Sequence, residues 1–223
     1  MRSHPSGTGK SSSPDTSNNR RPGSGRSWTL AAWPPHRPTS AWTRWRATAG
    51  RAPSRPPASS GTATSCSRGS RPEARRSLDD YRRLAGRLED AGGRAREAGL
   101  QLAYHNHDFE FERLDGAVPF DILAGTDPDL VQFQLDLYWI RKAGGDALAY
   151  FRRHPGRFPS VHVKDMAADG AMVDVGAGVI DWPALFAHAD TAVIRHYFVE
   201  HDQPADPLAS IRNSFIHLRG LER

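Results

Sequence analysis

Hydrophobic and polar residues alternate in regular periods only in the last two thirds of the chain. Leu78, Tyr81 and Leu84 recur at spacings of three residues, which predicts the apolar face of a helix. Ser77 is a residue type that caps the start of a helix, and Gly99 is one that ends it. We therefore expect a helix between Ser77 and Gly99.

Four apolar runs after this helix have the length and composition of strands. They cover residues 100–107, 130–139, 160–164 and 195–201. The segments between and after them carry helix-capping residues or helical spacing, and the expected helices cover 119–124, 146–153, a segment capped by Asp181 and a last helix opened by Asp206 and Pro207. This alternation predicts an α/β fold with parallel strands and helical crossovers.

The sequence favours a (β/α)₈ barrel over an open doubly wound sheet. An open sheet of the dinucleotide-binding kind would carry a glycine-rich phosphate turn after a strand, and no expected strand is followed by one. The expected fold class is therefore α/β, a partial (β/α)₈ TIM barrel with four βα units, preceded by a disordered segment; the family resemblance given below implies that these are about the last four units of the barrel.

Residues 1–76 lack periodic patterning, and their composition is that of a disordered segment. They contain no Val, Ile, Phe or Tyr, a single leucine and 10 of the 17 prolines. Such a sequence buries too little apolar surface to offset an ordering cost of about 1–2 kcal/mol per residue. We therefore expect two parts, a disordered low-complexity segment over 1–76 and a folded domain over 77–223.

Charge divides the chain at the same place. Residues 1–76 hold 14 of the 30 Lys and Arg but only two acids, whereas 77–223 hold 16 bases and 23 acids. The sequence pI near 9.8 therefore comes from the first segment. Three interpretations of that segment stay open: a basic tail that contacts nucleic acid or anionic surfaces, a plain disordered extension, and a shifted reading frame, which the abrupt change at Ser77 favours.

Cysteine content and hydropathy narrow the class of protein further. Cys66 is the only cysteine, so an intrachain disulfide is excluded. No run approaches the roughly 20 apolar residues of a membrane-spanning helix. We expect a cytoplasmic protein with no membrane partner, and nucleic acid is not the expected ligand of the acidic domain.

Ionisable side chains stand at the C-terminal end of every expected strand. In a barrel these ends meet at one mouth, so the side chains are expected to converge there. Alternate residues of a strand share a face, which groups the side chains within each strand end. The candidates, in chain order, are His105 and His107, then Asp136, then His162 and Lys164, then Glu200.

Imidazoles and carboxylates suit a divalent cation such as Mn²⁺, Mg²⁺, Co²⁺ or Zn²⁺. Such a cation can chelate adjacent oxygens of a hydroxy-ketone and stabilise the enediolate that forms when a base removes a carbon-bound proton. A carboxylate or histidine can move that proton, and Lys164 can stabilise the oxyanion. The structural alternatives stay open, such as a hydrogen-bonded core histidine at His107.

The strand ends also carry a family resemblance. The four motifs are Tyr-His-Asn-His-Asp-Phe-Glu-Phe at 104–111, Gln-Leu-Asp-Leu-Tyr-Trp at 134–139, Val-His-Val-Lys-Asp at 161–165 and Tyr-Phe-Val-Glu-His-Asp at 197–202. From about Ser77 to the end, the chain resembles the sugar phosphate isomerase/epimerase family with a xylose isomerase-like TIM barrel.

The resemblance implies a divalent metal, Mn²⁺ foremost, held by Glu, Asp, His and Glu at four strand ends. Asp136, His162 and Glu200 match the last three ligands, and His105 stands where many members carry the first Glu. In the dehydratase and lyase branches of the family, the residue at His107 would transfer protons. The metal ligands expected are therefore His105, Asp136, His162 and Glu200, and the catalytic residues expected are His107, Glu200 and Lys164.

The expected function is a metal-dependent isomerase or epimerase that acts on a sugar, keto-sugar or cyclitol. The alternatives are an inosose-type dehydratase or lyase, and an inactive fragment with a nucleic-acid-binding tail. A family member would carry four more βα units before Ser77. We therefore expect a half-barrel with exposed sheet edges, low stability, little activity and a tendency to aggregate or form homo-oligomers.

Overall fold

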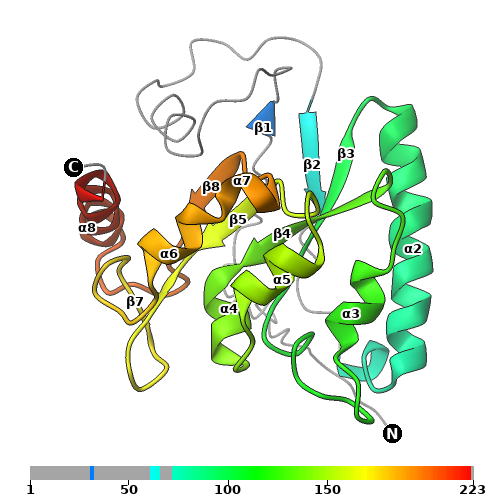
Figure 1. Ribbon diagram of the computed structural model, residues 1–223, viewed down its shortest axis with the longest axis horizontal. Coiled ribbons are helices and arrows are strands. Elements are labelled where there is room, and N and C mark those ends of the chain that lie inside the picture. The colour runs from blue at the N-terminus through cyan, green and yellow to red at the C-terminus, as the bar shows by residue number, and fades with distance from the viewer. Residues whose placement is uncertain (1–30, 33–60, 66–71, 222–223) are drawn as a thin grey trace, which may run out of the picture.

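The computed structural model describes residues 31–32, 61–65 and 72–221, and its centre is a mainly parallel sheet flanked by helices (Figure 1). Neighbouring strands run parallel except for the antiparallel pair β1–β2. In spatial order the strands are β1 (Ala31–Ala32), β2 (Gly61–Ser65), β3 (Gln101–His105), β4 (Val131–Asp136), β5 (Ser160–Val163) and β8 (His196–Val199).

A separate antiparallel hairpin follows β5 and consists of β6 (Asp165–Met166) and β7 (Met172–Val173). Figure 1 shows α2 beside β3 on the right and α8 at the left, beyond β8. The helices, in chain order, are the 3₁₀ helix η1 (Pro72–Ala74), α2 (Leu78–Glu97), α3 (Pro119–Ala124), α4 (Leu137–Lys142), α5 (Ala147–Arg153), α6 (Trp182–Ala187), α7 (Ala189–Ala192) and α8 (Pro207–Gly220).

The predicted fold class is confirmed. The strands β3, β4, β5 and β8 lie side by side in chain order and in parallel, with helices in the connections, as in part of a (β/α)₈ barrel. The four expected strands and the expected helices are all present, with boundaries that differ by a few residues. Among the described helices, none is both long enough and apolar enough to cross a membrane.

Local sequence explains where α2 begins and ends. Ser77 Oγ accepts a hydrogen bond from the Asp80 backbone N–H at 3.2 Å, and Asp80 Oδ2 accepts one from the Ser77 N–H at 3.0 Å. This reciprocal capping box satisfies backbone donors that the first turn leaves free. Gly99 has φ +73°, a conformation that glycine adopts without steric cost. Gly92 lies against the Leu130 backbone, where a Cβ atom would overlap the carbonyl oxygen.

The core between sheet and helices is rich in aromatic side chains. Phe120, Phe133 and Phe151 are fully buried, and Phe133 packs against Phe120 with ring centroids 5.0 Å apart. The buried guanidinium of Arg157 donates to the Ala124 carbonyl at 2.7 Å and lies 5.0 Å from the Phe133 ring. Its charge is therefore held by carbonyl oxygens and an aromatic face, which offsets part of the cost of burying it.

Two expected strand ends were wrong. The strand expected over 130–139 ends at Asp136, because the Asp136 carboxylate accepts the backbone N–H groups of Tyr138 and Trp139, each at 3.0 Å, and so starts α4. The strand expected over 100–107 ends at His105, so His107 lies in the turn beyond it. Each of these two strands therefore ends at an ionisable residue, β3 at His105 and β4 at Asp136.

The division expected at Ser77 stays a prediction, because most of residues 1–76 lie outside the described residues. Strand β2 lies before that division and pairs with β3, with Thr62 opposite Gln101 and Ser65 opposite Tyr104. The parallel pairing of β2 with β3 therefore extends the sheet to residues that precede Ser77.

Candidate metal and catalytic site

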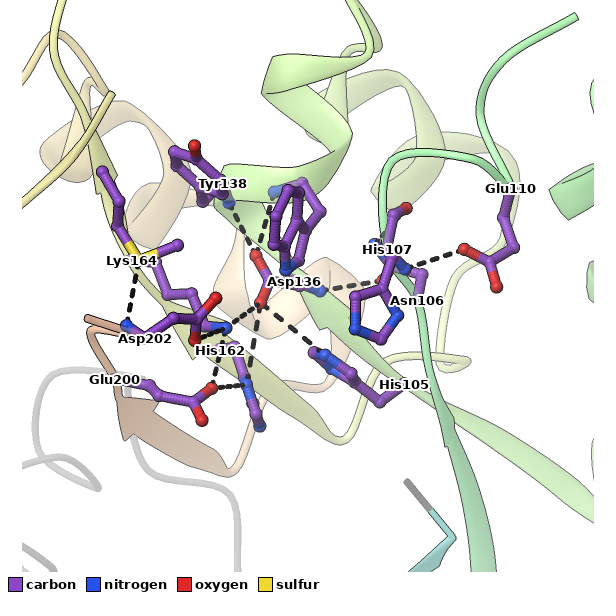
Figure 2. Close-up of polar contacts among 12 residues, drawn as sticks. His105, Asn106, His107, Glu110, Asp136, Tyr138, His162, Lys164, Glu200 and Asp202 are labelled. Atoms are coloured by element: carbon purple, nitrogen blue, oxygen red, sulfur yellow. Dashed lines mark hydrogen bonds and ion pairs between the residues drawn. The ribbon is translucent and has the colours of Figure 1, made fainter. Parts of the chain in front are cut away.

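The parallel register of the sheet gathers four strand ends at one edge. Asp136 on β4 lies opposite His162 on β5, and His162 lies opposite Phe198 on β8. On the other side, β3 ends at His105, which pairs with Gln134 of β4. Figure 2 shows that the side chains from these ends point toward one another.

Three of these side chains can offer ligand atoms to one cation. One atom each from His105, Asp136 and His162 lies within 4.8 Å of the others. Asp136 Oδ2 is 3.8 Å from His105 Nε2 and 3.7 Å from His162 Nδ1. Asp136 Oδ2 is also buried and has no hydrogen-bond partner in the described part of the chain, although the charged Lys164 Nζ lies 3.3 Å from it. A divalent cation fits this donor set, because imidazole nitrogen and carboxylate oxygen are its ordinary ligands.

Glu200 extends the cluster from β8. Its Oε2 lies 2.7 Å from His162 Nδ1 and 2.9 Å from Lys164 Nζ. The neighbouring imidazole of His162, together with Lys164, holds the pKa of Glu200 well below its usual range, although burial acts in the opposite direction. Glu200 is therefore a carboxylate at neutral pH, and it contacts His162 at the border of the triad.

Lys164 stands at the centre of three carboxylates. Its Nζ lies 2.8 Å from Asp202 Oδ1, 2.9 Å from Glu200 Oε2 and 3.3 Å from Asp136 Oδ2. Burial acts to lower the pKa of Lys164, but the carboxylates, Asp136 foremost, raise it above its usual value. Lys164 is therefore a fixed positive charge beside the site.

Burial has the largest effect on the pKa of Asp136. It raises the pKa of this carboxyl to about 6, against the opposing effects of Lys164 and His162. The two oxygens of the carboxyl group have different neighbours, because Oδ1 caps α4 and Oδ2 faces the imidazoles. Its position at the junction of β4 and α4 thus fixes the direction in which Oδ2 points.

Both histidines near the end of β3 favour the neutral imidazole. Burial lowers the pKa of His105 and, to a smaller extent, that of His107, and the positive charge of Lys164 acts in the same direction. The His107 ring lies 5.0 Å from the His105 ring and stacks on Phe109 at 5.5 Å. His107 Nδ1 is buried and has no hydrogen-bond partner among the described residues.

The structure thus brings together all six residues singled out from the sequence, His105, His107, Asp136, His162, Lys164 and Glu200. Their individual roles as ligands or catalysts stay predictions. Asp202 joins the group as well, because its carboxylate accepts a hydrogen bond from Lys164 Nζ at 2.8 Å.

Two buried residues near the site were missed by the sequence reasoning. Asn106 Oδ1 accepts the Asp136 backbone N–H at 2.9 Å, and Glu110 Oε2 accepts the His107 backbone N–H at 2.7 Å. Burial raises the pKa of Glu110 to about 7. A signal was present, because Glu110 stands between two phenylalanines, and a carboxylate in an apolar setting needs a partner.

A third buried carboxylate organises the loop after the β6–β7 hairpin. Asp165 accepts hydrogen bonds from the backbone N–H of Gly176 at 2.8 Å, from the Ile180 N–H at 3.3 Å and from Trp182 Nε1 at 2.9 Å. Gly178 also donates to it. This acceptor stands one residue after Lys164 and fixes the loop that precedes α6.

Comparison with known proteins gives a family and several relatives. The family described as xylose isomerase-like TIM barrel matches residues 58–219. Inosose dehydratase of Lacticaseibacillus casei is 36% identical over 95 residues, which is 40% of this chain and 29% of that protein. Inosose dehydratase of Clostridium perfringens is 26% identical over 152 residues, which is 58% of this chain and 51% of that protein.

A solved structure gives a similar result. A sugar phosphate isomerase/epimerase from Parabacteroides distasonis is 27% identical and superposes with a TM-score of 0.58. The superposition covers 64% of this chain and 53% of that structure. The chain therefore spans about half, or less, of the length of the relatives that it matches.

Proposed function

The chain belongs to the xylose isomerase-like TIM barrel family, and on that premise we propose that its site removes a proton beside the carbonyl group of a keto-cyclitol (an inosose) or keto-sugar. The reaction favoured is the dehydration of an inosose, assisted by a divalent cation, Mn²⁺ foremost. The single observation that supports this most is the convergence of His105, Asp136 and His162 at neighbouring strand ends.

The residues of the triad would hold the cation, with Glu200 beside them. When bound, a divalent cation polarises the carbonyl oxygen of the substrate and makes the neighbouring C–H group more acidic. Asp136 supplies negative charge, and His105 supplies a neutral imidazole because burial lowers its pKa.

His107 is the proposed proton acceptor. Its imidazole favours the neutral form, its Nδ1 has no partner among the described residues, and its ring lies beside that of His105. Glu200 is the alternative acceptor, but its lowered pKa makes it the weaker base. Lys164 holds a positive charge that can balance the negative charge on the substrate oxygen.

Dehydration and epimerisation share this first step. In dehydration, the C–H bond beside the carbonyl breaks, a carbon–carbon double bond forms, and hydroxide on the next carbon leaves with a proton as water. In epimerisation, the proton returns to the opposite face of the same carbon. The inosose dehydratases among the relatives favour the first reaction, and the isomerase/epimerase structure supports the second as the alternative.

Proton exchange tests the shared step before either product is identified. The chain would be incubated with an inosose in D₂O, with Mn²⁺ or with excess chelator, and the proton beside the carbonyl followed by ¹H NMR. We expect its signal to decay faster with Mn²⁺, and we expect His107→Ala to lose most of this acceleration, by about 10²–10⁴-fold. His154→Ala, at a histidine outside the site, is the control.

Two results would contradict the proposal: equal exchange with Mn²⁺ and with chelator, or full activity in His107→Ala together with Glu200→Ala. A second spectrum in the same experiment separates the reactions, because dehydration removes a ring hydroxyl and epimerisation retains every oxygen.

A further inference from the structure

Both polar backbone groups of His107 are held by neighbouring side chains. Glu110 Oε2 accepts the His107 N–H at 2.7 Å, and Asn106 Nδ2 donates to the His107 carbonyl at 3.3 Å. Asn106 and Glu110 are themselves almost fully buried. Figure 2 shows the two side chains on either side of the His107 backbone.

Asn106 also connects this segment to the candidate cation ligand on the next strand. The backbone ladder between β3 and β4 ends with the pair His105 and Gln134. One residue beyond it, Asn106 Oδ1 accepts the Asp136 N–H at 2.9 Å. The amide side chain therefore continues the cross-strand connection where the β3 backbone turns away, and it links the His107 segment to Asp136.

Glu110 closes the other side of the turn. It is 0% exposed, and besides the His107 N–H it accepts the Tyr104 hydroxyl at 2.6 Å. Its own carbonyl accepts the Phe120 N–H at 2.7 Å, which anchors the turn to α3. A carboxyl group is costly to bury, so its presence among aromatic residues calls for a role that an apolar side chain cannot fill.

The backbone of His107 determines where its ring can lie. The ring occupies a space bounded by Phe109, with which it is stacked, by Trp139 at 5.7 Å and by His105 at 5.0 Å. A shift of the backbone would move the ring relative to His105 and the cation site. Displacements of about 1 Å in a catalytic group can lower a rate about 100-fold.

We propose that Asn106 and Glu110 are positioning residues, which clamp the backbone of His107 and thereby hold its ring beside the cation site. This proposal rests on the proposed function of His107 for its catalytic consequence. The clamp itself is a property of the metal-free chain, so it can be tested without substrate or cation.

Amide hydrogen exchange tests the clamp directly. Removal of the acceptor in Glu110→Ala should accelerate exchange of the His107 amide by about tenfold or more, because a hydrogen bond to a charged or buried acceptor is lost. Glu110→Gln keeps a carbonyl acceptor and should retain most of the protection. Glu112→Ala, an exposed glutamate two residues away, is the matched control and should leave exchange unchanged.

Unchanged protection of the His107 amide in Glu110→Ala would overturn the clamp. If Glu110→Ala does not fold, as judged by its thermal transition, Glu110→Leu replaces it, because leucine fills the space without offering an acceptor. Faster exchange throughout the domain, rather than around His107, would show a general structural role and would also overturn the proposal.

The catalytic consequence is tested with the proton-exchange assay. Glu110→Ala should lower kcat more than it raises KM, Glu110→Gln should restore most of the rate, and Glu110→Ala should have little further effect in a His107→Ala background. Faster exchange of the His107 amide in Glu110→Ala together with an unchanged kcat would refute the positioning role. A wild-type chain without proton exchange would refute the proposed function, and the amide experiment alone would then decide the clamp.

Discussion

His162 Nδ1 lies 2.7 Å from Glu200 Oε2, across two neighbouring strands. The contact follows from the register, because His162 pairs with Phe198 and Glu200 stands two residues after Phe198, directly after the end of β8. Residues two apart in an extended chain point to the same face of the sheet. Two residues that are distant in sequence thus come into contact at the edge of the sheet. The same register places Asp136 beside His162 and completes the group.

Asp136→Asn should weaken Mn²⁺ binding by more than about tenfold, since loss of even an outer-shell partner costs 10–100-fold. Asn can retain the cap of α4, because its side-chain oxygen can accept the same two N–H groups. The loss should therefore reflect the missing negative charge rather than unfolding. Isothermal titration calorimetry with Mn²⁺ measures the change.

Asp202→Asn is the control for this titration, because Asp202 contacts Lys164 but stands outside the triad. We expect it to change Mn²⁺ affinity much less than Asp136→Asn. Equal affinities for wild type and Asp136→Asn would remove Asp136 from the ligand set.

Glu110 should make the stability of the chain depend on pH. Its pKa is raised from 4.5 to about 7 by burial, so the folded state binds a proton that the unfolded state releases in this window. The contribution of Glu110 to the free energy of unfolding should be largest below pH 4.5. It should fall as the pH rises toward 7, by roughly 3 kcal/mol at most. Urea unfolding between pH 4.5 and 8 measures this slope.

Glu110→Gln should flatten that dependence, because glutamine has no proton to lose. The comparison is between slopes, so other titrating groups cancel. A wild-type slope that persists unchanged in the variant would assign the dependence to other groups.

Gly178 lies against the buried carboxylate that fixes its loop. A Cβ atom there would overlap Asp165 Oδ1, whereas a Cβ at Gly93 in α2 would meet nothing within 4 Å. Gly178→Ala should therefore lower the free energy of unfolding by about 1–3 kcal/mol. Gly93→Ala should raise it by about 0.5–1 kcal/mol. Chemical denaturation of both variants checks the opposite signs.

Helix α8 exposes apolar side chains that include Leu208, 75% exposed, and Ile216, 61% exposed. Exposed apolar groups of this size favour self-association. Replacing both by Lys should lower light scattering at high protein concentration and change the unfolding free energy by only about 0.5 kcal/mol per substitution. Leu218→Lys, at a buried position of the same helix, should unfold the chain instead.

Unchanged scattering in the double variant would show that α8 does not drive association. The low stability and aggregation expected from the sequence stay predictions. The light-scattering and unfolding measurements test whether the exposed face of α8 contributes to the aggregation.

The sequence predicted the alternating fold because its signals are local. Ser77 and Asp206 cap their helices as expected, and Pro119–Ala124 forms the short helix expected over the same residues. The gathering of His105, Asp136 and His162 also followed from a simple rule, since parallel strands end at one edge. Period and capping chemistry therefore sufficed for the elements, and the parallel order of the strands sufficed for the convergence of these three side chains.

The contacts around the site were harder to predict, because they depend on side chains that act on distant backbone. Asp136 ends its strand by capping α4, although its apolar neighbours are typical of a continuing strand. The contacts of Asn106 and Glu110 with the Asp136 and His107 backbone were missed because no residue pattern displays such contacts, although the apolar neighbours of Glu110 signalled that it needs a partner. Lys164 was predicted to be near the site, but its contact with three carboxylates emerged only from the structure.

The divided carboxylate of Asp136 has one further consequence. Because Oδ1 is committed to two backbone donors of α4, only Oδ2 faces the two imidazoles and Lys164. The position of α4 therefore decides which oxygen of Asp136 would take part in a cation site. Any change that shifts the start of this helix would also turn the carboxylate away from its neighbours on β3 and β5.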